Sequence, residues 1–491
     1  MAALILRKYL CASAVLLAFG FPAHAAQPPD VVTSDGNGNT AMGSNALLNN
    51  ATGVLNTASG DSALVSNTAG GSNTATGAHA MEFNTTGGQN TAVGTTALRF
   101  NTTGAANTAI GEVALLSNTT GVENTAAGAH ALIGNTTGIE NTAMGVNALA
   151  SNSTASSNTA VGYVALMNNT TGANNVAAGA GALFANSSGF ENVASGVNAL
   201  GGNTTGSQNT AVGTAALGNS STGNANNAVG AYALASNTTG VNNTAAGTSA
   251  LASNTTGFTN SAVGGAALSN NTTGAQNTAI GGAALLLNTT GNDNIALGMN
   301  AGSRLTTGNA NIAIGNPGVA GESGAIHIGT QGTQGATYLA GVWGARVRKG
   351  ASVVVNASGQ LGVEESSERY KTDVTPLGPS SEAIQQLRPV TYRLKSDPTG
   401  ERQYGLIAEE VNQVYPELVV RDDAGNIEGV RYDRLAPILI REIQQQQRTA
   451  AAQAEQLREL EQQFAEAQAL NRAMQVALMN LQAERSRVAQ R

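Results

Sequence analysis

Residues 90–106 read Asn-Thr-Ala-Val-Gly-Thr-Thr-Ala-Leu-Arg-Phe-Asn-Thr-Thr-Gly-Ala-Ala. The motif Asn-Thr-Ala-x-Gly that opens this stretch begins at Asn39 and recurs at every seventeenth position until Asn311, without an insertion or deletion. The first, third and fifth positions are Asn, Ala and Gly in every copy, whereas the Thr at the second position is replaced in some. A period this strict predicts a solenoid in which each repeat forms one turn of the chain.

The residues of each repeat, numbered 1–17 from the motif Asn, predict short strands joined by tight turns. Asn-Thr-Thr-Gly at positions 12–15 is turn sequence, because Asn tolerates left-handed backbone and Gly supplies positive φ. Ala recurs at positions 3 and 8, which predicts a narrow interior. We therefore expect a mainly β fold, with a β-solenoid or β-roll shaft over residues 39–315. The Asn side chains at position 1 should form a hydrogen-bonded ladder along it.

Positions 8 and 9, usually Ala-Leu, carry a prediction about assembly. If they lie in a strand, their side chains point to opposite faces, and the outer apolar face needs cover from a partner chain. If they lie in a turn, both side chains share one interior. We expect the strand arrangement, and with it an oligomeric rod.

The charge distribution argues against several kinds of ligand. The whole chain has a net charge of −7, and residues 39–315 contain few charged residues and no Lys. The sequence therefore offers no basic surface for nucleic acid. Calcium-binding repeats need recurrent Asp, which these repeats lack. No clustered His, Cys or carboxylate residues indicate a metal or a cofactor, so we expect neither.

Residues 1–25 resemble a secretory signal peptide. A positive start at Arg7 and Lys8 precedes an apolar run too short to span a bilayer, and Ala23-His24-Ala25 is a small-residue cleavage site. We expect a linker at residues 26–38, no transmembrane span in the mature chain, and a secreted or cell-surface location.

The sequence changes character beyond residue 358. It reads Gly-Gln-Leu-Gly-Val-Glu-Glu-Ser-Ser-Glu-Arg-Tyr-Lys-Thr-Asp-Val at 359–374, Leu-Arg-Pro-Val-Thr-Tyr-Arg-Leu at 387–394, Gln-Tyr-Gly-Leu-Ile-Ala-Glu-Glu-Val at 403–411 and Pro-Glu-Leu-Val at 416–419. This series resembles the intramolecular chaperone domain at the C-terminus of phage endosialidases, tailspikes and L-shaped tail fibres, which also occurs in a membrane-bound eukaryotic transcription factor. The resemblance covers about residues 366–447 and the helix that follows.

The resemblance implies a function and a site. In that family the domain drives trimer assembly of the β-rich fibre that precedes it, and then cuts itself off through a Ser-Lys dyad. The matching residues are Ser366, the first residue of the released piece, and Lys371. The expected cut falls between Glu365 and Ser366. The protein would be a homotrimer, and its serine peptidase would act once, on its own chain.

The chemistry of these residues is consistent with that role. A Ser hydroxyl needs a base, and a Lys amine serves as one only when burial depresses its pKa. Five positions on a straight helix rotate the chain by about 500°, which leaves two side chains roughly 140° apart. A bend or an extended turn must therefore bring Ser366 and Lys371 together, and assembly would remove water from the Lys. If Ser366 and Lys371 are only surface residues, the domain would act as a chaperone and would not cleave the chain.

Further elements are expected around this domain. A β-rich stem occupies residues 316–365, and short helices and a long C-terminal helix follow in and after the chaperone domain at 366–447. Residues 448–491 place apolar side chains at alternating steps of three and four, the seam of a coiled coil. The apolar members of the seam are Leu457, Leu460, Phe464, Ala467, Met474, Leu478 and Leu481, and the polar Asn471 within it would fix the register of the helices.

The expected protein is a secreted trimeric fibre or adhesin-like surface protein, with a cell-surface receptor or glycan as its outside partner. The repeats resemble in type the trimeric β-roll heads of bacterial adhesins, whose repeats are shorter. One alternative is a structural or ice-binding repeat protein that does not cleave itself, since Thr recurs in rows. Another is a spike that binds or degrades polysaccharide, which would need paired carboxylates about 5–10 Å apart.

Overall fold

The computed structural model describes residues 33–342, 351–356, 358–363, 366–377, 379–422 and 424–489. It divides into two compact units, at residues 1–347 and 348–491. The expected signal peptide at residues 1–25 lies outside the described residues. No helix in the described part of the chain has the apolar length that a membrane span requires.

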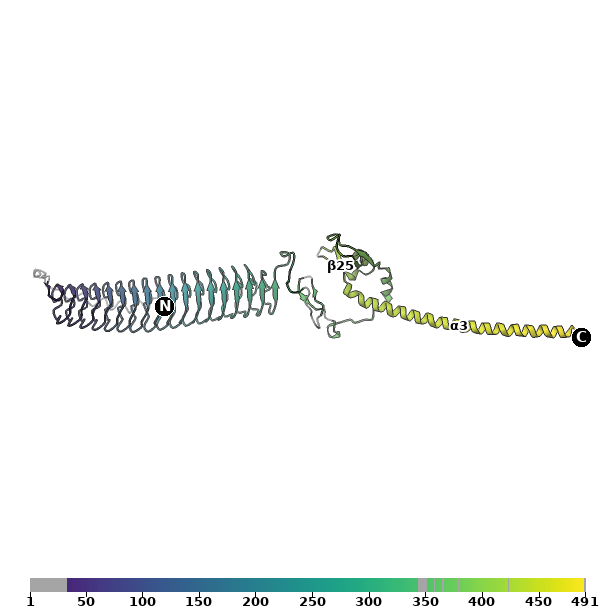
Figure 1. The fold of residues 1–491 in the computed structure, drawn as a ribbon, viewed down its shortest axis with the longest axis horizontal. Helices are drawn as coiled ribbons and strands as arrows, with labels where there is room; N and C mark the ends of the chain where they lie inside the picture. The colour runs from purple at the N-terminus through teal and green to yellow at the C-terminus, as the bar shows by residue number, and fades with distance from the viewer. Residues whose placement is uncertain are drawn as a thin grey trace. The chain divides into compact units, whose positions relative to one another are not determined.

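Each repeat contributes one short strand, formed by positions 2 to 4 of the motif, and the rest of the repeat forms turns (Figure 1). Consecutive strands pair in parallel and in register, so that each residue lies beside its counterpart in the next repeat, as Ala92 beside Ala109. The fold class predicted from the sequence, a β-solenoid shaft, is confirmed. The strands of the repeats are β2 (Thr40–Met42), β3 (Thr57–Ser59), β4 (Thr74–Thr76), β5 (Thr91–Val93), β6 (Thr108–Ile110), β7 (Thr125–Ala127), β8 (Thr142–Met144), β9 (Thr159–Val161), β10 (Val176–Ala178), β11 (Val193–Ser195), β12 (Thr210–Val212), β13 (Asn227–Val229), β14 (Thr244–Ala246), β15 (Ser261–Val263), β16 (Thr278–Ile280), β17 (Ile295–Leu297) and β18 (Ile312–Ile314).

The sheet extends one strand beyond the repeats at each end. β1 (Thr33–Ser34) pairs antiparallel with β2, and β19 (Ile326–Ile328) pairs in parallel with β18, although the segment that joins them is shorter than in a full repeat. His327, in the middle of β19, lies opposite Ala313, and its Nε2 is 2.9 Å from an oxygen of Glu322. The shaft therefore ends in a shortened turn of the same coil.

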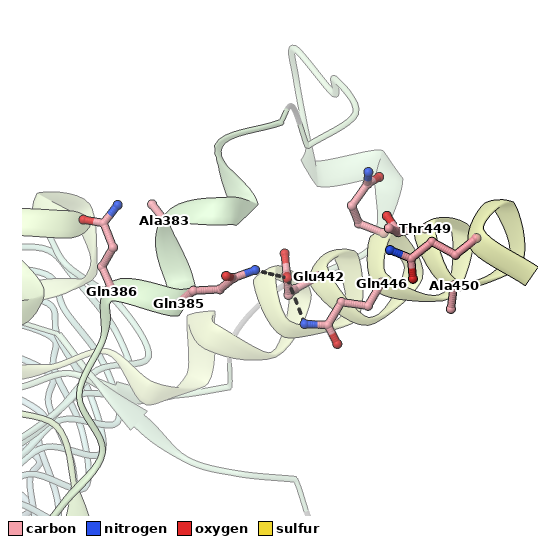
Figure 2. Close-up of a pocket in the computed structure, with 9 residues that line it drawn as sticks. Ala383, Gln385, Gln386, Glu442, Gln446, Thr449 and Ala450 are labelled. Atoms are coloured by element: carbon pink, nitrogen blue, oxygen red, sulfur yellow. Dashed lines mark hydrogen bonds between the residues drawn. The ribbon is translucent and has the colours of Figure 1, made fainter. Parts of the chain in front are cut away.

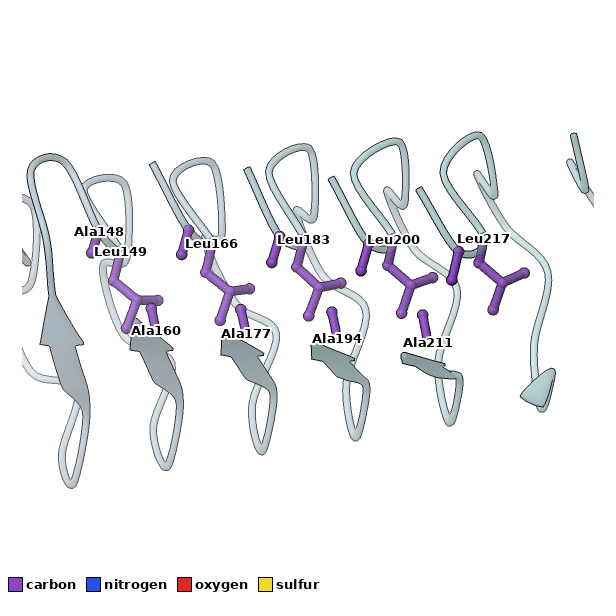
Figure 3. Close-up of a cluster of buried hydrophobic side chains, with 14 of the residues drawn as sticks. Ala148, Leu149, Ala160, Leu166, Ala177, Leu183, Ala194, Leu200, Ala211 and Leu217 are labelled. Carbon is purple, nitrogen blue, oxygen red and sulfur yellow. The ribbon is translucent and has the colours of Figure 1, made fainter. Parts of the chain in front are cut away.

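The interior of the coil is filled by Ala at positions 3 and 8 and Leu at position 9, which are fully buried through most of the shaft (Figure 3). The prediction that positions 8 and 9 form a strand with two buried faces is wrong. Both lie in a turn, and Leu at position 9 has positive φ, as Leu98 does at 53°. In this conformation both side chains point into the same interior, so they supply no argument for a partner chain.

Left-handed backbone at a Leu costs about 1–2 kcal/mol. Complete burial of the side chain returns roughly 1.5–3 kcal/mol, which offsets the strain. The same conformation recurs at position 7, as in Thr96, and at position 17, as in Ala106. Burial offsets the strain at position 9, whereas Thr96 is half-buried and Ala106 is exposed, and their amides donate to carbonyls of the preceding turn.

Two ladders of Asn side chains run along the interior. At position 1, Nδ2 of Asn107 donates to Oδ1 of Asn90 at 3.1 Å and to the carbonyl of Gly121 at 2.8 Å. This ladder was predicted and is confirmed. At position 12 a second ladder runs beside it: Nδ2 of Asn118 donates to Oδ1 of Asn101 at 2.8 Å and to the same Gly121 carbonyl at 3.0 Å. The ladders satisfy polar groups that the narrow interior removes from water.

The second unit contains a small α+β domain and a long helix. Its core comprises Val411, Tyr415, Leu418, Val419, Leu435 and Ile438. The strands are β20 (Val354–Val355), β21 (Leu361–Gly362), β22 (Val390–Tyr392), β23 (Gln403–Gly405), β24 (Val419–Arg421) and β25 (Ile427–Val430), paired antiparallel as β20–β21, β22–β23 and β24–β25. The helices are η1 (Glu368–Tyr370), η2 (Pro379–Gln386), α2 (Ala408–Val414), η3 (Pro416–Leu418), η4 (Tyr432–Arg434) and α3 (Leu435–Val488).

Helix α3 is 54 residues long and has Pro437 in its first turn, where no helical hydrogen bond is lost. Leu435 and Ile438, near its start, pack in the core of the small domain. Beyond residue 447 the helix makes no apolar core, and the large apolar side chains of the predicted seam, such as Leu457 and Phe464, are exposed in the single chain. The long helix is confirmed, and its assembly into a coiled coil stays a prediction.

We expect Ser220→Asn to stabilise the shaft. Ser220 interrupts the second ladder, and its Oγ and the Oδ1 of Asn203 are buried without a hydrogen-bond partner among the described residues. Restoring the Asn satisfies both neighbours and should raise the free energy of unfolding by about 1–3 kcal/mol. The measurement is thermal unfolding of the full chain by circular dichroism. As the matched control, Asn169→Ser opens a new gap and should lower the transition; equal transitions for the two variants would contradict the ladder's role.

We expect Gly264→Ala to disrupt the shaft and Gly265→Ala to leave it intact. Gly264 is at position 5, has φ of +131°, and a Cβ there would lie 2.6 Å from the carbonyl oxygen of Gly281 on the next turn. A Cβ on Gly265 meets nothing within 4 Å. Urea unfolding should show a loss of several kcal/mol for the first variant and about 0.5 kcal/mol or less for the second. Similar losses for both would contradict the close stacking of turns.

Candidate functional site

Ser366 and Lys371 flank the single turn of 3-10 helix η1. Ser367 precedes the turn in extended conformation, with φ −68° and ψ 144°. The turn is closed by the amide of Tyr370, which donates to the carbonyl of Ser367, and by that of Lys371, which donates to Glu368, both at 3.0 Å. Lys371 is again extended, with φ −111° and ψ 136°. A tight turn between two extended residues returns the chain toward its start.

This local fold brings the two predicted residues together. Nζ of Lys371 lies 3.1 Å from Oγ of Ser366 and donates a hydrogen bond to it. A straight α-helix could not make this contact, because a separation of five positions rotates the side chains about 140° apart. The expectation that a bend or extended turn joins the pair agrees with this geometry. The other predicted residue, Glu365, lies outside the described residues.

Both members of the pair are exposed to solvent in the single chain. A Lys amine in water carries a proton at neutral pH and can only donate to a hydroxyl, whereas general-base chemistry needs the neutral amine. The contact is within the heavy-atom distance that proton transfer requires, about 2.6–3.2 Å. General-base chemistry at this pair also needs water to be excluded, and in the isolated chain the pair is open to solvent.

The residues between the pair form a surface stack. The Arg369 guanidinium lies over the Tyr370 ring, 4.8 Å from its centroid. The adjacent opposite charges of Glu368 and Arg369 would suit a surface ion pair, but no salt bridge between them is found in the described ranges. The cation–π contact fixes the direction of Arg369 within the turn.

Two of the motif segments in the small domain are joined by an ion pair that the sequence did not predict. Arg388, before β22, contacts both carboxylate oxygens of Glu410 in α2, at 2.6 and 3.3 Å. The hydrogen bond from Arg388 lowers the pKa of Glu410, and the same bond raises the pKa of Arg388. The pair is exposed, so its effect is to set geometry more than to add stability.

The Tyr-Gly-Leu segment at 404–406 has a structural reason for its Gly. The Tyr432 hydroxyl, from η4, accepts a hydrogen bond from the amide of Leu406 at 2.8 Å. A Cβ on Gly405 would lie 2.6 Å from that hydroxyl oxygen. Gly405 therefore leaves the space in which Tyr432 ties the end of β23 to η4, directly before α3.

A polar groove between η2 and α3 was also missed by the sequence reasoning. Figure 2 shows Gln385 and Gln446 directed at the carboxylate of Glu442, and both donate to its Oε1, at 2.8 and 3.0 Å. Glu442 is only 6% exposed, and its Oε2 has no hydrogen-bond partner among the described residues. Within the described ranges, no group of three His, Cys, Asp or Glu residues is arranged to hold a metal ion.

Comparison with known proteins identifies the domain that holds the Ser366–Lys371 pair. Residues 366–420 match the family described as chaperone of endosialidase, a family classed as a peptidase. The match begins at Ser366 and covers η1, η2, the β22–β23 hairpin, α2 and η3. Neither the comparison with curated proteins nor that with solved structures found a match. The chain thus carries a chaperone-of-endosialidase domain behind a β-solenoid shaft, a combination that fits a fibre-like protein.

We expect Gly405→Ala and Tyr432→Phe each to destabilise the small domain by about 1 kcal/mol, because each removes the hydrogen bond from the Leu406 amide to the Tyr432 hydroxyl. Since they break the same bond, the double variant should lose clearly less than the two losses together. Urea unfolding followed by circular dichroism in the helical region of the spectrum measures this. Additive losses would contradict the explanation of Gly405.

Proposed function

We propose that this chain is a secreted, trimeric fibre whose C-terminal domain directs assembly of the shaft and then cleaves the peptide bond between Glu365 and Ser366. The observation that carries the proposal is the contact of 3.1 Å between Ser366 and Lys371. It occurs at the first residues of the segment that matches a peptidase-class chaperone family. The cleaved bond would lie at the boundary of that segment.

The proposed reaction uses only this chain's residues and water. The Ser366 hydroxyl adds to the carbonyl carbon of Glu365, and its proton passes to the neutral amine of Lys371. The C–N bond breaks as Lys371 returns the proton to the departing Ser366 nitrogen, which leaves Glu365 joined to Ser366 through an ester. Water then hydrolyses the ester, and the products are a carboxylate at Glu365 and a free amine and hydroxyl on Ser366. Each active site acts once.

Assembly would switch this reaction on. The pair is exposed in the single chain, so a neighbouring copy must supply the burial that favours a neutral Lys. Helix α3 offers a means of association, because its seam presents Leu457, Leu460, Phe464 and Met474 to solvent along one long helix. Coupling cleavage to association would release the chaperone only after the shaft has its partners.

The shaft explains why such a chaperone is needed. Its turns are nearly identical, so two chains can pair out of register by one full repeat at little cost in contacts. A domain at one end that associates first fixes the register before the turns pack. Secretion would depend on the segment at residues 1–25, and a receptor or glycan would be the outside partner of the finished fibre.

We expect the wild-type chain to give two fragments on a denaturing gel, with masses that meet between Glu365 and Ser366. Ser366→Ala removes the nucleophile, and Lys371→Arg keeps the charge but cannot provide a neutral amine, so both variants should remain whole. Ser367→Ala is the matched control and should be cut like the wild type, since Ser366 holds the contact with Lys371.

Light scattering on the same samples separates cleavage from assembly. The uncut variants should still be trimers, which would show that they fold. Cleavage of Ser366→Ala, or a trimeric wild type that stays whole, would contradict the proposed peptidase. A monomeric wild type would contradict the proposed fibre as well.

A further inference from the structure

The outer face of the shaft's parallel sheet carries an apolar row, interrupted by Ser59, Thr76 and Ser195. Position 3 points inward and is buried in every repeat strand from β3 to β18, so positions 2 and 4 point outward. Position 4 holds a large apolar residue in most turns, and the members named next are 38–49% exposed. Examples are Val93, Ile110, Met144, Val161, Val212 and Ile280.

The outward positions of the sheet carry no charged side chain that would favour contact with water. Neither position 2 nor position 4 holds a charged residue in any copy of the repeat. The apolar character rises at the C-terminal end of the shaft, where both outward positions of three adjacent strands are apolar. These residues are Ile295, Leu297, Ile312, Ile314, Ile326 and Ile328. A soluble chain rarely leaves an uncharged apolar strip of this length uncovered.

We propose that this sheet face packs, in register, against the same face of the other copies of the chain, so that the faces meet around the axis of the trimer. The face consists of side-chain ridges repeated at the strand spacing of about 4.8 Å. A surface with the same spacing over the same number of turns is needed to interlock with it, and another copy of this shaft has that surface. Parallel, in-register alignment also places the apolar ends at β17–β19 against each other.

The dimensions of the face suit such an interface. A strand of this length makes the sheet roughly 10 Å wide, and the stacked turns span about 80 Å, which gives on the order of 800 Å² per copy. Specific protein interfaces of standard size bury about this area on each partner. The lack of charge argues against nucleic acid or a charged polymer as the occupant. Ice is the remaining rival, because Thr fills most of position 2.

This inference deepens the proposed fibre, since it rests on association of the chains, but it does not depend on self-cleavage. It also differs from the sequence prediction about positions 8 and 9. Those residues are buried within one chain, and the apolar row that is available to a partner lies at position 4, on the outer face of the sheet.

Single cysteine substitutions test the face directly, because Cys11 is the only Cys in the chain and can be changed to Ser. Ile280→Cys lies on the face, and Leu287→Cys, in the same repeat but at position 11, is the matched control; the two native residues are 43% and 45% exposed. The full chain is treated with a mild oxidant or a short bis-maleimide and run on a denaturing gel. We expect at least tenfold more covalent dimer from Ile280→Cys than from Leu287→Cys.

Each other outcome overturns the inference in a distinguishable way. A trimer by light scattering in which both variants cross-link equally, or neither does, would show that the chains associate through another surface. A monomer would overturn this inference together with the proposed fibre. Thermal hysteresis of the purified protein without cross-linking at Ile280→Cys would assign the face to ice. Circular dichroism of both variants verifies that the shaft has folded.

Discussion

The shaft depends on close stacking of identical turns, in which every group lies over its counterpart in the next repeat. Gly at position 5 permits the approach, because a side chain there would meet the backbone of the next turn. The Asn side chains at positions 1 and 12 then bond from turn to turn and satisfy the backbone carbonyls that face the interior. Ala and Leu fill the space that remains. A substitution at one of these positions also disturbs the contacts of the neighbouring turn, which explains why the period is strict.

The same constraint creates a problem of assembly. Because the turns are nearly identical, two chains can pair in several registers with nearly the same contacts, so the turns alone do not specify one register. The C-terminal unit is different in kind: its sequence does not repeat, it has its own small core, and its long helix exposes an apolar seam. A unit that associates uniquely can set the register of one that does not. The contact between Ser366 and Lys371 lies where the family match begins, and a cut there would separate shaft from chaperone.

Much of the fold and of the candidate site could be predicted from the sequence, and the predictions that failed did so for specific physical reasons. The solenoid, its narrow interior and the position 1 ladder could be predicted because Asn, Ala and Gly recur at fixed positions of every repeat, a pattern that few other structures require. The turn at positions 8 and 9 could not be read, because Leu seldom adopts positive φ and does so here only because it is buried. Ser366 and Lys371 were found through the resemblance of their surroundings. Arg388 with Glu410, and Gly405 with Tyr432, join segments that are well separated in the sequence, and spacing alone does not reveal such pairs.

Native mass spectrometry of the mature wild-type protein tests the central claim most directly. We predict two separate trimers, one of shafts that end at Glu365 and one of fragments that begin at Ser366, with an amine at the new terminus. A single species of intact, monomeric chains would contradict it.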